Sequence, residues 1–418
     1  MANDKNVVVI SLDGFPAYAL EDERLPIPTL RNLMRNGASA KRMKTVNPSV
    51  TWPNHTAIIT GVDASRHGVL YNGMLTRPAP NQPVKVEPWR DKAEMVKAPT
   101  VYDLAHQNGM TTAQVDWVAI QNAATITWQF PEVPKVTGPI EKEMIASGEL
   151  TEADITGFGR INITRRDQLW TRAAVHILKQ HKPNLLLYHL LNLDSTHHTY
   201  GPRNQASNSG IAFADAQVRE LLEAVDLSKT AVIVVSDHGF RAVTRNIRPN
   251  AVLHHHGLLE TTSCTAYAVP EGGTAMIYIT DRAKRAELIP KVKEMFKGVD
   301  GVDRVIDASG FAEIGFPDPD KYDQMADVVL SAKPGYAFSG QMDGGPVDLT
   351  NSPRVTGSHG FLSSDPDMDA IFIACGAGVR KGVVLDTVRN YDVAPTIAEL
   401  LGLKMEGVQG RSLRAILV

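Results

Sequence analysis

The sequence predicts an α/β protein with a mostly parallel central sheet, helices on both faces of that sheet and a smaller inserted subdomain. Continuous apolar runs, typical of strands that are buried on both faces, begin at Val7 and Thr230. Helical segments alternate with these runs, and such alternation favours a parallel sheet. At 418 residues the chain exceeds the usual size of a single core, so an insertion is expected.

The apolar runs end in polar or small residues. The expected strands are residues 7–12, followed by Asp13; 185–193, followed by Asp194 to His198; 230–235, followed by Ser236, Asp237 and His238; and 369–374, followed by Cys375. In open α/β sheets, ligands bind outside the carboxyl ends of the strands. Residues at these ends are therefore candidates for chemistry.

Helices are expected between these strands, at residues 28–36, 100–108, 166–180, 211–225 and 393–401. Gly109 and Gly402 follow two of them as stop residues. We expect residues 1–240 and 357–418 to form the core and residues 241–356 to form an inserted subdomain, with a strand at 275–279 and a charged helix at 282–297. Residues 76–98 form a second, proline-rich insertion.

Composition excludes several classes of protein. The chain carries 43 Lys and Arg against 46 Asp and Glu, and no basic run indicates a polymeric nucleic acid or a membrane surface as a partner. The two cysteines, Cys264 and Cys375, lie far apart in apolar or small-residue settings, so both are expected in the core. No apolar run is long enough to span a membrane.

The sequence does not determine the compartment. The first strand begins near Val7, which leaves no room for a signal peptide before it. The short lead at residues 1–5 would equally remain after removal of a signal, which would place the protein in the periplasm or outside the cell; otherwise it is cytoplasmic. The oligomeric state is not indicated.

The segment from Asn47 to Thr56 places a hydroxyl residue at the start of a helix. Residues 54–61 are expected to form a short helix that ends at Gly61, with Thr51 just before its first turn. Unpaired N–H groups and the positive end of the helix dipole favour an anion there, so Thr51 is a candidate nucleophile. The alternative is that Thr51 serves only as an N-cap.

Carboxylates and imidazoles recur at the predicted functional edge of the sheet. They are Asp13, Asp194, His198, Asp237, His238 and His359. Each alone is compatible with a helix cap, a solvated loop, a turn or a surface histidine. All except His359 follow a long apolar run, however, and His359 lies in a loop of small residues; this coincidence favours a metal site. This set of ligands suits zinc, with manganese or iron as substitutes.

Five short motifs, in a fixed order along the chain, resemble those of a known protein family. They are Thr-Trp-Pro-Asn-His-Thr at 51–56, Asp-Ser-Thr-His-His-Thr-Tyr-Gly-Pro at 194–202, Ser-Asp-His-Gly-Phe at 236–240, Gly-Ser-His-Gly-Phe at 357–361 and Tyr-Asp-Val-Ala-Pro-Thr at 391–396. In this order they resemble the type I phosphodiesterase/nucleotide pyrophosphatase family of the alkaline phosphatase superfamily. The resemblance spans nearly the whole chain and implies an alkaline-phosphatase-like fold.

The resemblance also implies a division of the ligands between two zinc ions. Asp194, His198 and His359 would hold one ion, and Asp13, Asp237 and His238 the other, with Thr51 as its reactive ligand. Two divalent ions about 3.5–4 Å apart clamp a phosphoryl group and lower the pKa of an attacking hydroxyl, which threonine needs at neutral pH. The expected reaction is hydrolysis of a small phosphate diester or nucleotide through a phosphothreonine intermediate at Thr51.

Substrate preference depends on what surrounds the phosphate. Asn72 falls where the family resembled here has an asparagine that binds a nonbridging oxygen, and a neutral donor suits a diester; Arg66 nearby would instead suit the dianion of a monoester. Trp52 either contacts the leaving group or packs in the core. His197 is expected to lie behind the ligands or at the surface, and the run His254 to His256 has no expected catalytic role.

Two rival functions stay open. A phosphonoacetate hydrolase, which cleaves a C–P bond, would need lysines from the insertion for the substrate carboxylate, and Lys85, Lys92 and Lys97 are available. A catalytically silent protein that binds phosphate esters is disfavoured, because no metal or nucleophile position is missing.

Overall fold

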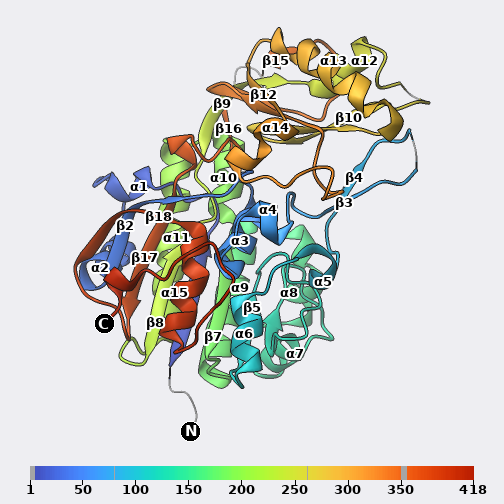
Figure 1. Cartoon of the computed structure of the whole chain (residues 1–418). Helices are drawn as coiled ribbons and strands as arrows, with labels where there is room; N and C mark the ends of the chain where they lie inside the picture. Colours follow the sequence, from blue (N-terminus) through green and yellow to red (C-terminus); the bar gives the residue numbers. More distant parts are fainter. Residues whose placement is uncertain (1–4, 80, 261, 350–354) are drawn as a thin grey trace.

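The computed structural model describes residues 5–79, 81–260, 262–349 and 355–418 (Figure 1). The lead that we considered as the remnant of a signal therefore lies outside the described residues, except for Lys5. Within the described part, none of the helices combines the length and the apolarity that crossing a bilayer requires.

An eight-stranded central sheet organises the molecule, in the order β18-β2-β17-β8-β1-β7-β5-β6. Its strands are β1 (Asn6–Leu12), β2 (Ala38–Lys44), β5 (Thr112–Val115), β6 (Trp128–Phe130), β7 (Leu185–Leu190), β8 (Thr230–Val235), β17 (Ala370–Gly376) and β18 (Val383–Arg389). Strand β1 pairs in parallel with both β7 and β8. Strand β17 runs antiparallel to β8 and β2. The predicted mostly parallel sheet is confirmed.

The antiparallel direction of β17 corrects one prediction. Because β17 runs against β8, its carboxyl end at Cys375 and Gly376 lies at the edge opposite to Asp13 and Asp237. The amino end of β17 lies at the expected functional edge instead. There the carbonyl of Asp369, which precedes the strand, accepts from the N–H of Ala17. The residues after this fourth apolar run thus cannot join the others.

Strands β2, β5, β6 and β18 were not predicted. Strand β2 contains the exposed Lys41 and Arg42 and lacks a continuous apolar run, and β5 and β6 have only four and three residues. Pairing with neighbouring strands forms these elements, and that pairing has no local signal in the sequence.

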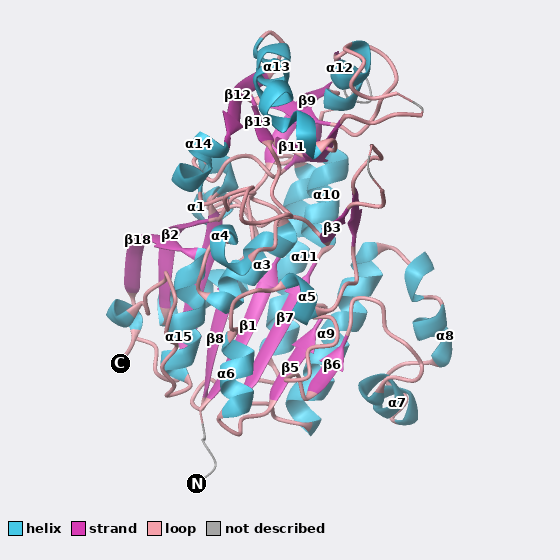
Figure 2. Cartoon of the chain, turned by 45° about the vertical axis from the view of Figure 1, so that its right-hand side comes forward, coloured by secondary structure: helices cyan, strands magenta, loops and turns pink. Residues whose placement is uncertain are grey.

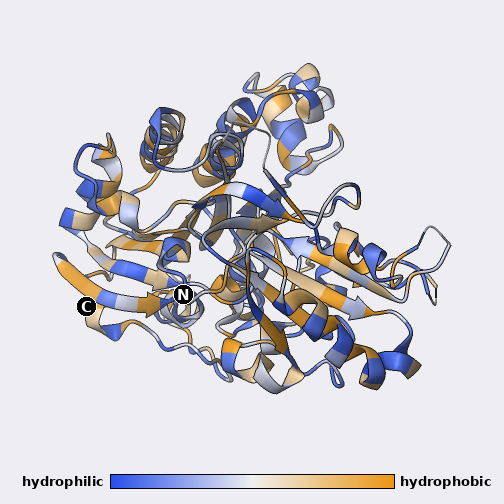
Figure 3. Cartoon of the chain, turned by 90° about the horizontal axis from the view of Figure 1, so that it is seen from above, coloured by the Kyte–Doolittle hydropathy of each residue, from blue (hydrophilic) through white to orange (hydrophobic). Residues whose placement is uncertain are grey.

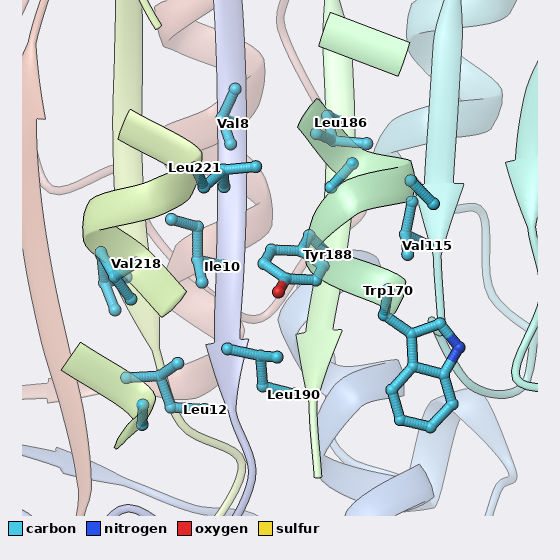
Figure 4. Close-up of a cluster of buried hydrophobic side chains, with 14 of the residues drawn as sticks. Val8, Ile10, Leu12, Val115, Trp170, Leu186, Tyr188, Leu190, Val218 and Leu221 are labelled. Atoms are coloured by element: carbon cyan, nitrogen blue, oxygen red, sulfur yellow. The ribbon is translucent and has the colours of Figure 1, made fainter. Parts of the chain in front are cut away.

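Helices cover both faces of the sheet, as predicted (Figure 2). One face packs against α2 (Pro28–Asn36), α9 (Ile163–Gln180) and α11 (Gln205–Leu222), the other against α6 (Val101–Gln107) and α15 (Val393–Leu400). Successive residues of β1 serve the two faces in alternation. Figure 4 shows Ile10 of β1 beside Tyr188 of β7, and Val8 level with Leu186, in the first of these cores.

The observed helices agree with the predicted ones within a few residues at most ends. Helix α2 has the predicted bounds, whereas α9 begins three residues earlier because Asn162 caps it, accepting from the N–H of Arg165. Helix α11 begins six residues earlier, where Asn204 accepts from the N–H of Ser207. Each cap side chain accepts a hydrogen bond from an N–H of the first turn that has no partner within the helix, and this bond fixes where the helix begins.

The upper part of Figure 1 lies beyond the carboxyl ends of β1, β7 and β8 and consists mainly of residues from the expected insertion. Its strands are β9 (Arg241–Ile247), β10 (Ala266–Glu271), β11 (Thr274–Ile279), β12 (Val302–Asp307), β13 (Val328–Ala332), β14 (Gly335–Phe338), β15 (Val347–Leu349) and β16 (Thr356–Ser358), and its helices are α12 (Pro249–His255), α13 (Arg285–Lys297) and α14 (Ala308–Phe311). One sheet has the order β10-β11-β13-β12, and another contains β14, β9, β15 and β16. The predicted strand and charged helix are present as β11 and α13, while the division at residues 240 and 357 stays a prediction.

The second insertion forms a hairpin of β3 (Met74–Thr76) and β4 (Lys85–Glu87), followed by α5 (Lys92–Met95). Leu75 and Val84 pack with Met276 and Tyr278 of β11, so the two insertions share one core. The remaining helices are α1 (Tyr18–Glu21), α3 (Thr51–Thr60), α4 (Ala64–His67), α7 (Pro139–Ala146), α8 (Glu152–Thr156) and α10 (Asn192–Tyr200).

Cys264 and Cys375 are buried and unpaired with each other, as expected. Seen from above, hydrophilic and hydrophobic residues alternate along the peripheral helices (Figure 3). Such helices bury one face and expose the other.

Candidate active site

Two neighbouring parallel strands bring the first group of acidic residues together. Asp13 follows β1 directly, and Asp237 and His238 follow β8 after one intervening serine. Ser11 pairs with Val235, so both strands end at the same level of the sheet. The candidate ligand atoms of Asp13, Asp237 and His238 lie within 4.8 Å of one another, and all three side chains are buried.

Each carboxylate of this group is held through one oxygen. Asp237 Oδ1 accepts from the N–H of Gly14 at 3.1 Å and of His238 at 2.9 Å, and Asp13 Oδ2 faces His189 Nε2 at 3.0 Å. Among the described residues, Asp237 Oδ2 and Asp13 Oδ1 have no hydrogen-bond partner although both are buried. Uncompensated buried carboxylate oxygens are costly, so these two atoms fit a bound cation.

Two residues of the second group, Asp194 and His198, lie on α10, which begins two residues after β7, and the third, His359, follows β16 directly. The predicted strand to Leu193 is too long, because β7 ends at Leu190 and residues 192–200 are helical. The helix nevertheless places Asp194 and His198 on one face at a spacing of four residues. His198 Nε2 and His359 Nε2 lie 3.5 and 3.7 Å from Asp194 Oδ1, which has no hydrogen-bond partner in the described chain.

The three histidines of the two groups share one orientation. Nδ1 of His198 donates to the carbonyl of Gly357 at 3.2 Å, Nδ1 of His359 to that of Ser49 at 3.2 Å, and Nδ1 of His238 to that of Gly239 at 3.1 Å. In each neutral ring, Nε2 therefore carries no proton, and its lone pair faces the carboxylates. Metal-binding histidines are oriented in the same way, by a hydrogen bond from the other ring nitrogen.

The two groups adjoin each other. The rings of His238 and His359 stack with centroids 3.8 Å apart. Burial together with the charge of Asp194 raises the pKa of Asp13 to about 7, and burial together with the charge of Asp237 raises the pKa of Asp194 to about 8. Burial lowers the pKa of His359 to about 3, which keeps its ring neutral. Neutral imidazoles among crowded carboxylates fit two divalent cations.

Thr51 is the first residue of α3, so the helix begins three residues earlier than predicted. Val50 occupies the N-cap position, so Thr51 lies within the first turn of the helix and is not its N-cap. Thr51 Oγ1 instead lies 3.5 Å from His238 Nε2. Gly61 ends the helix in the left-handed conformation, with φ of 71°, as its position predicted.

A cleft of about 280 Å³ is bordered by Thr51 and the second group, while the buried first group adjoins it through His238, whose Nε2 lies 3.5 Å from Thr51 Oγ1. Its walls consist of Thr51, Trp52, Asn72, Pro88, Trp89, Val118, Glu132, His189, Leu191, Asp194, His198 and His359. In Figure 1, α3 and α10, which supply several of these residues, lie between the central sheet and the upper part.

Asn72 presents a hydrogen-bond donor to this cleft. Its Oδ1 accepts from the backbone N–H of Trp52 at 3.0 Å, which leaves the amide NH₂ as the end that donates outward. The Trp52 side chain is only 7% exposed, yet it borders the cleft, and the ring of Trp89 meets it edge-on at a centroid distance of 6.1 Å. Trp52 is thus both packed and part of the cleft wall.

The four basic side chains that were considered as alternative substrate-binding groups lie outside the cleft. Arg66 donates to the carbonyl of Gly407 at 2.6 Å, and Lys92 pairs with Asp103 at 2.6 Å. Lys97 donates to the carbonyl of Glu94, and Lys85 is exposed on the hairpin. None of these four side chains lines the described cleft.

Two further histidine predictions can be compared with the structure. His197 is buried, and its Nε2 lies 2.8 Å from Ser207 Oγ, so it packs behind the second group and does not reach the surface. His254 to His256 lie at the end of α12 in the upper part, where they are exposed.

His189 and Asp116 are site residues that the sequence analysis missed. His189, inside the apolar strand β7, faces Asp13 Oδ2 with Nε2 and lies 3.2 Å from Asp116 Oδ2 with Nδ1. Burial opposes a charge on His189, but hydrogen bonds to Asp116 and Asp13 raise its pKa well above the usual value. A lone histidine within an apolar run was the available signal.

Comparison with known proteins identifies one family. The model of the family described as type I phosphodiesterase/nucleotide pyrophosphatase matches residues 7–362. Ectonucleotide pyrophosphatase/phosphodiesterase family member 7 of Homo sapiens is 22% identical over 98% of this chain and 82% of its own length. A bis(5'-adenosyl)-triphosphatase of Mus musculus is 22% identical over 95% of this chain and 78% of its own length.

Solved structures share the fold. Murine ectonucleotide pyrophosphatase/phosphodiesterase 5, as an inactive variant in complex with AMP, has a TM-score of 0.74 and 19% sequence identity, over 99% of this chain and 100% of that one. The human protein of the same name has the same TM-score and 18% identity. These likenesses confirm the alkaline-phosphatase-like fold, and the match of the family model extends over most of the chain. The chain therefore belongs to the type I phosphodiesterase/nucleotide pyrophosphatase family.

Proposed function

We propose that this protein hydrolyses small phosphate diesters, including nucleotides, through nucleophilic attack by Thr51 beside two divalent cations. The observation that carries the proposal is a cleft that brings together the Thr51 hydroxyl, the second group of candidate ligands and Asn72, with the first group buried next to Thr51. The names of the relatives support the same reaction class.

The ligand atoms that remain free in each group indicate which residues hold the cations. Asp13 Oδ1, Asp237 Oδ2 and His238 Nε2 would hold one ion beside Thr51. Asp194 Oδ1 with Nε2 of His198 and His359 would hold the other. Imidazole and carboxylate ligands in this proportion favour zinc, with manganese or iron as substitutes.

When bound, the two cations supply a lowered pKa for the threonine hydroxyl and neutralise charge on the phosphoryl and leaving oxygens. Thr51 Oγ1 forms a bond to phosphorus as the bond to the leaving oxygen breaks; the hydroxyl proton passes to solvent, and the leaving oxygen takes a proton from solvent. Water then attacks the phosphothreonine, releases the phosphate monoester and restores the hydroxyl. The start of α3 adds the positive end of a helix dipole to the side of the nucleophile.

Asn72 and the two tryptophans set the substrate class. The Asn72 NH₂ donates to a nonbridging oxygen, and a neutral donor matches the single negative charge of a diester. Trp52 and Trp89 offer aromatic surface to a planar leaving group such as a nucleobase. The complex of inactive murine ectonucleotide pyrophosphatase/phosphodiesterase 5 with AMP supports a nucleotide as the ligand class.

A panel of substrates tests the proposal on zinc-loaded protein. We expect turnover of bis(p-nitrophenyl) phosphate and of a nucleoside triphosphate to exceed that of p-nitrophenyl phosphate, and we expect no turnover of phosphonoacetate. Preferred cleavage of phosphonoacetate would replace the proposal with C–P bond hydrolysis. Binding of these esters without turnover by fully loaded protein would indicate a silent binding protein.

A further inference from the structure

A third group of metal-ligating side chains lies outside the cleft. It consists of Glu143 on α7, His176 on α9 and His181 just after α9, with candidate ligand atoms within 4.8 Å of one another. We propose that Glu143, His176 and His181 bind a divalent cation of the zinc type that fastens α7 to the end of α9.

The distances within the group suit a tetrahedral ion. Glu143 Oε2 lies 3.3 Å from His176 Nε2 and 2.6 Å from His181 Nε2. Ligands about 2.0–2.1 Å from a tetrahedral zinc are ~3.3 Å from one another, so small shifts bring all three atoms into place. The Glu143 side chain is 40% exposed, which leaves the fourth position open to water.

The outer hydrogen bonds of the two rings fix them for this role. His176 is 4% exposed, and its Nδ1 lies 2.8 Å from Glu149 Oε1. A carboxylate on the far nitrogen of a histidine is the arrangement that orients metal-binding imidazoles and raises their basicity. The His181 ring stacks on Trp128 of β6 with centroids 3.8 Å apart, which restricts its rotation.

A cation would satisfy the polar atoms of the group that face one another. A neutral His176 has one N–H, and Glu149 accepts it at Nδ1, so Nε2 faces the Glu143 carboxylate with a lone pair. Two facing acceptors repel unless a proton or a cation lies between them. A cation shared by Glu143, His176 and His181 satisfies both imidazoles and the carboxylate at once.

The position of the group indicates a structural role. The N-terminal part of α9 lies near the cleft edge of the sheet, where Asp167 accepts from the N–H of Leu191 and Asn192. His181 is fourteen residues further along, about 21 Å at the rise of an α-helix. In Figure 1, α7 lies at the end of the molecule away from the upper part. The ion would therefore secure residues 139–149 against α9 and would take no part in the reaction.

Zinc content separates this site from the catalytic pair. The parent chain, stripped with a chelator, reloaded with zinc and desalted, should contain about three ions by mass spectrometry. His181→Ala and the isosteric Glu143→Gln should each contain one ion fewer, with unchanged bis(p-nitrophenyl) phosphate turnover as evidence of correct folding. His256→Ala, which removes an exposed imidazole from the histidine run, is the matched control and should bind as many ions as the parent.

Glu149→Gln tests the outer hydrogen bond. Loss of such a partner weakens metal binding by about 10- to 100-fold, so the zinc Kd of the third site should rise by that factor. If the catalytic pair failed to bind metal, the parent would contain one ion and His181→Ala none, which keeps the two proposals distinguishable. Equal zinc content in the parent, His181→Ala and Glu143→Gln would overturn the third site, as would loss of the extra ion in His256→Ala alone.

Discussion

Replacing Asn72 separates its two hydrogen-bonding roles. Its Oδ1 accepts from the Trp52 N–H at the start of α3, and its NH₂ faces the cleft. Asn72→Ala removes both groups, whereas Asn72→Asp keeps the acceptor, removes the donor and adds a negative charge. The two variants therefore change stability and turnover in different orders.

The expected magnitudes follow from these contacts. Losing the bond to the Trp52 N–H should cost about 0.5–1.5 kcal/mol of unfolding free energy in Asn72→Ala. Deleting one preorganised donor to developing charge should lower diester kcat by roughly ten- to a thousandfold. The carboxylate of Asn72→Asp adds repulsion toward the phosphate of about 1 kcal/mol in water and about 4 kcal/mol at an effective dielectric constant of 20, for charges 4 Å apart.

The assay is kcat/KM for bis(p-nitrophenyl) phosphate, measured with the melting temperature on zinc-loaded protein. Turnover should be highest in the parent, lower in Asn72→Ala and lowest in Asn72→Asp. Stability should be similar in the parent and Asn72→Asp, and lower in Asn72→Ala. If turnover instead followed stability, with Asp close to the parent and Ala lower, Asn72 would serve only to hold the start of α3. A parent that preferred p-nitrophenyl phosphate would also refute the reasoning on a neutral donor.

Three further predictions concern the nucleophile and the cations. Thr51→Ala should keep both catalytic ions yet lose several orders of magnitude in diester turnover, and Thr51→Ser should retain part of it; normal turnover by the alanine variant would remove the nucleophile. Chelation should abolish turnover and zinc should restore it, whereas a metal-free preparation with full activity would contradict the cation proposal. In metal-free protein, Asp13 and Asp194 have pKa values of about 7 and about 8, above the unfolded value of about 4, so the native state binds more protons in this window and its stability should fall as pH rises through it. Bound zinc should make this fall in stability less steep. Melting temperatures measured between pH 5 and pH 8, with and without zinc, give the pH dependence of stability in both states.

The sequence was informative where a long apolar strand ends in a titratable residue. Asp13 and Asp237 could be placed together because the runs before them read as buried parallel strands, and β1 and β8 are neighbours. The residues of the second group were also identified, but Leu191 and Leu193 extended the apolar run and hid the start of α10. The structure thus brings the predicted residues close together, but on a local structure that was not predicted.

The residues that were missed depend on contacts between distant segments. His189 lies within an apolar strand, and its role follows from Asp13 on β1 and Asp116 after β5. Strand β5 has four residues and little apolar pattern, so the acid at its end could not be recognised. Trp89 adopts a positive φ of 64° in the loop after β4, a conformation that its sequence does not announce. Tertiary pairing determines all three positions.

The upper sheets contribute to the site through the loop that carries His359. The N–H of Gly273, in the turn between β10 and β11, donates to the His359 carbonyl at 2.8 Å, while the carbonyl of Ser49 accepts the His359 Nδ1–H and the N–H of Gly360. Gly360 has a φ of 77°, and a Cβ there would lie 1.7 Å from the Glu271 carbonyl oxygen. Only glycine allows this approach. The turn between β10 and β11 and the segment before α3 therefore hold His359 from opposite sides, so a change in the upper sheet that moves this turn also displaces a candidate metal ligand.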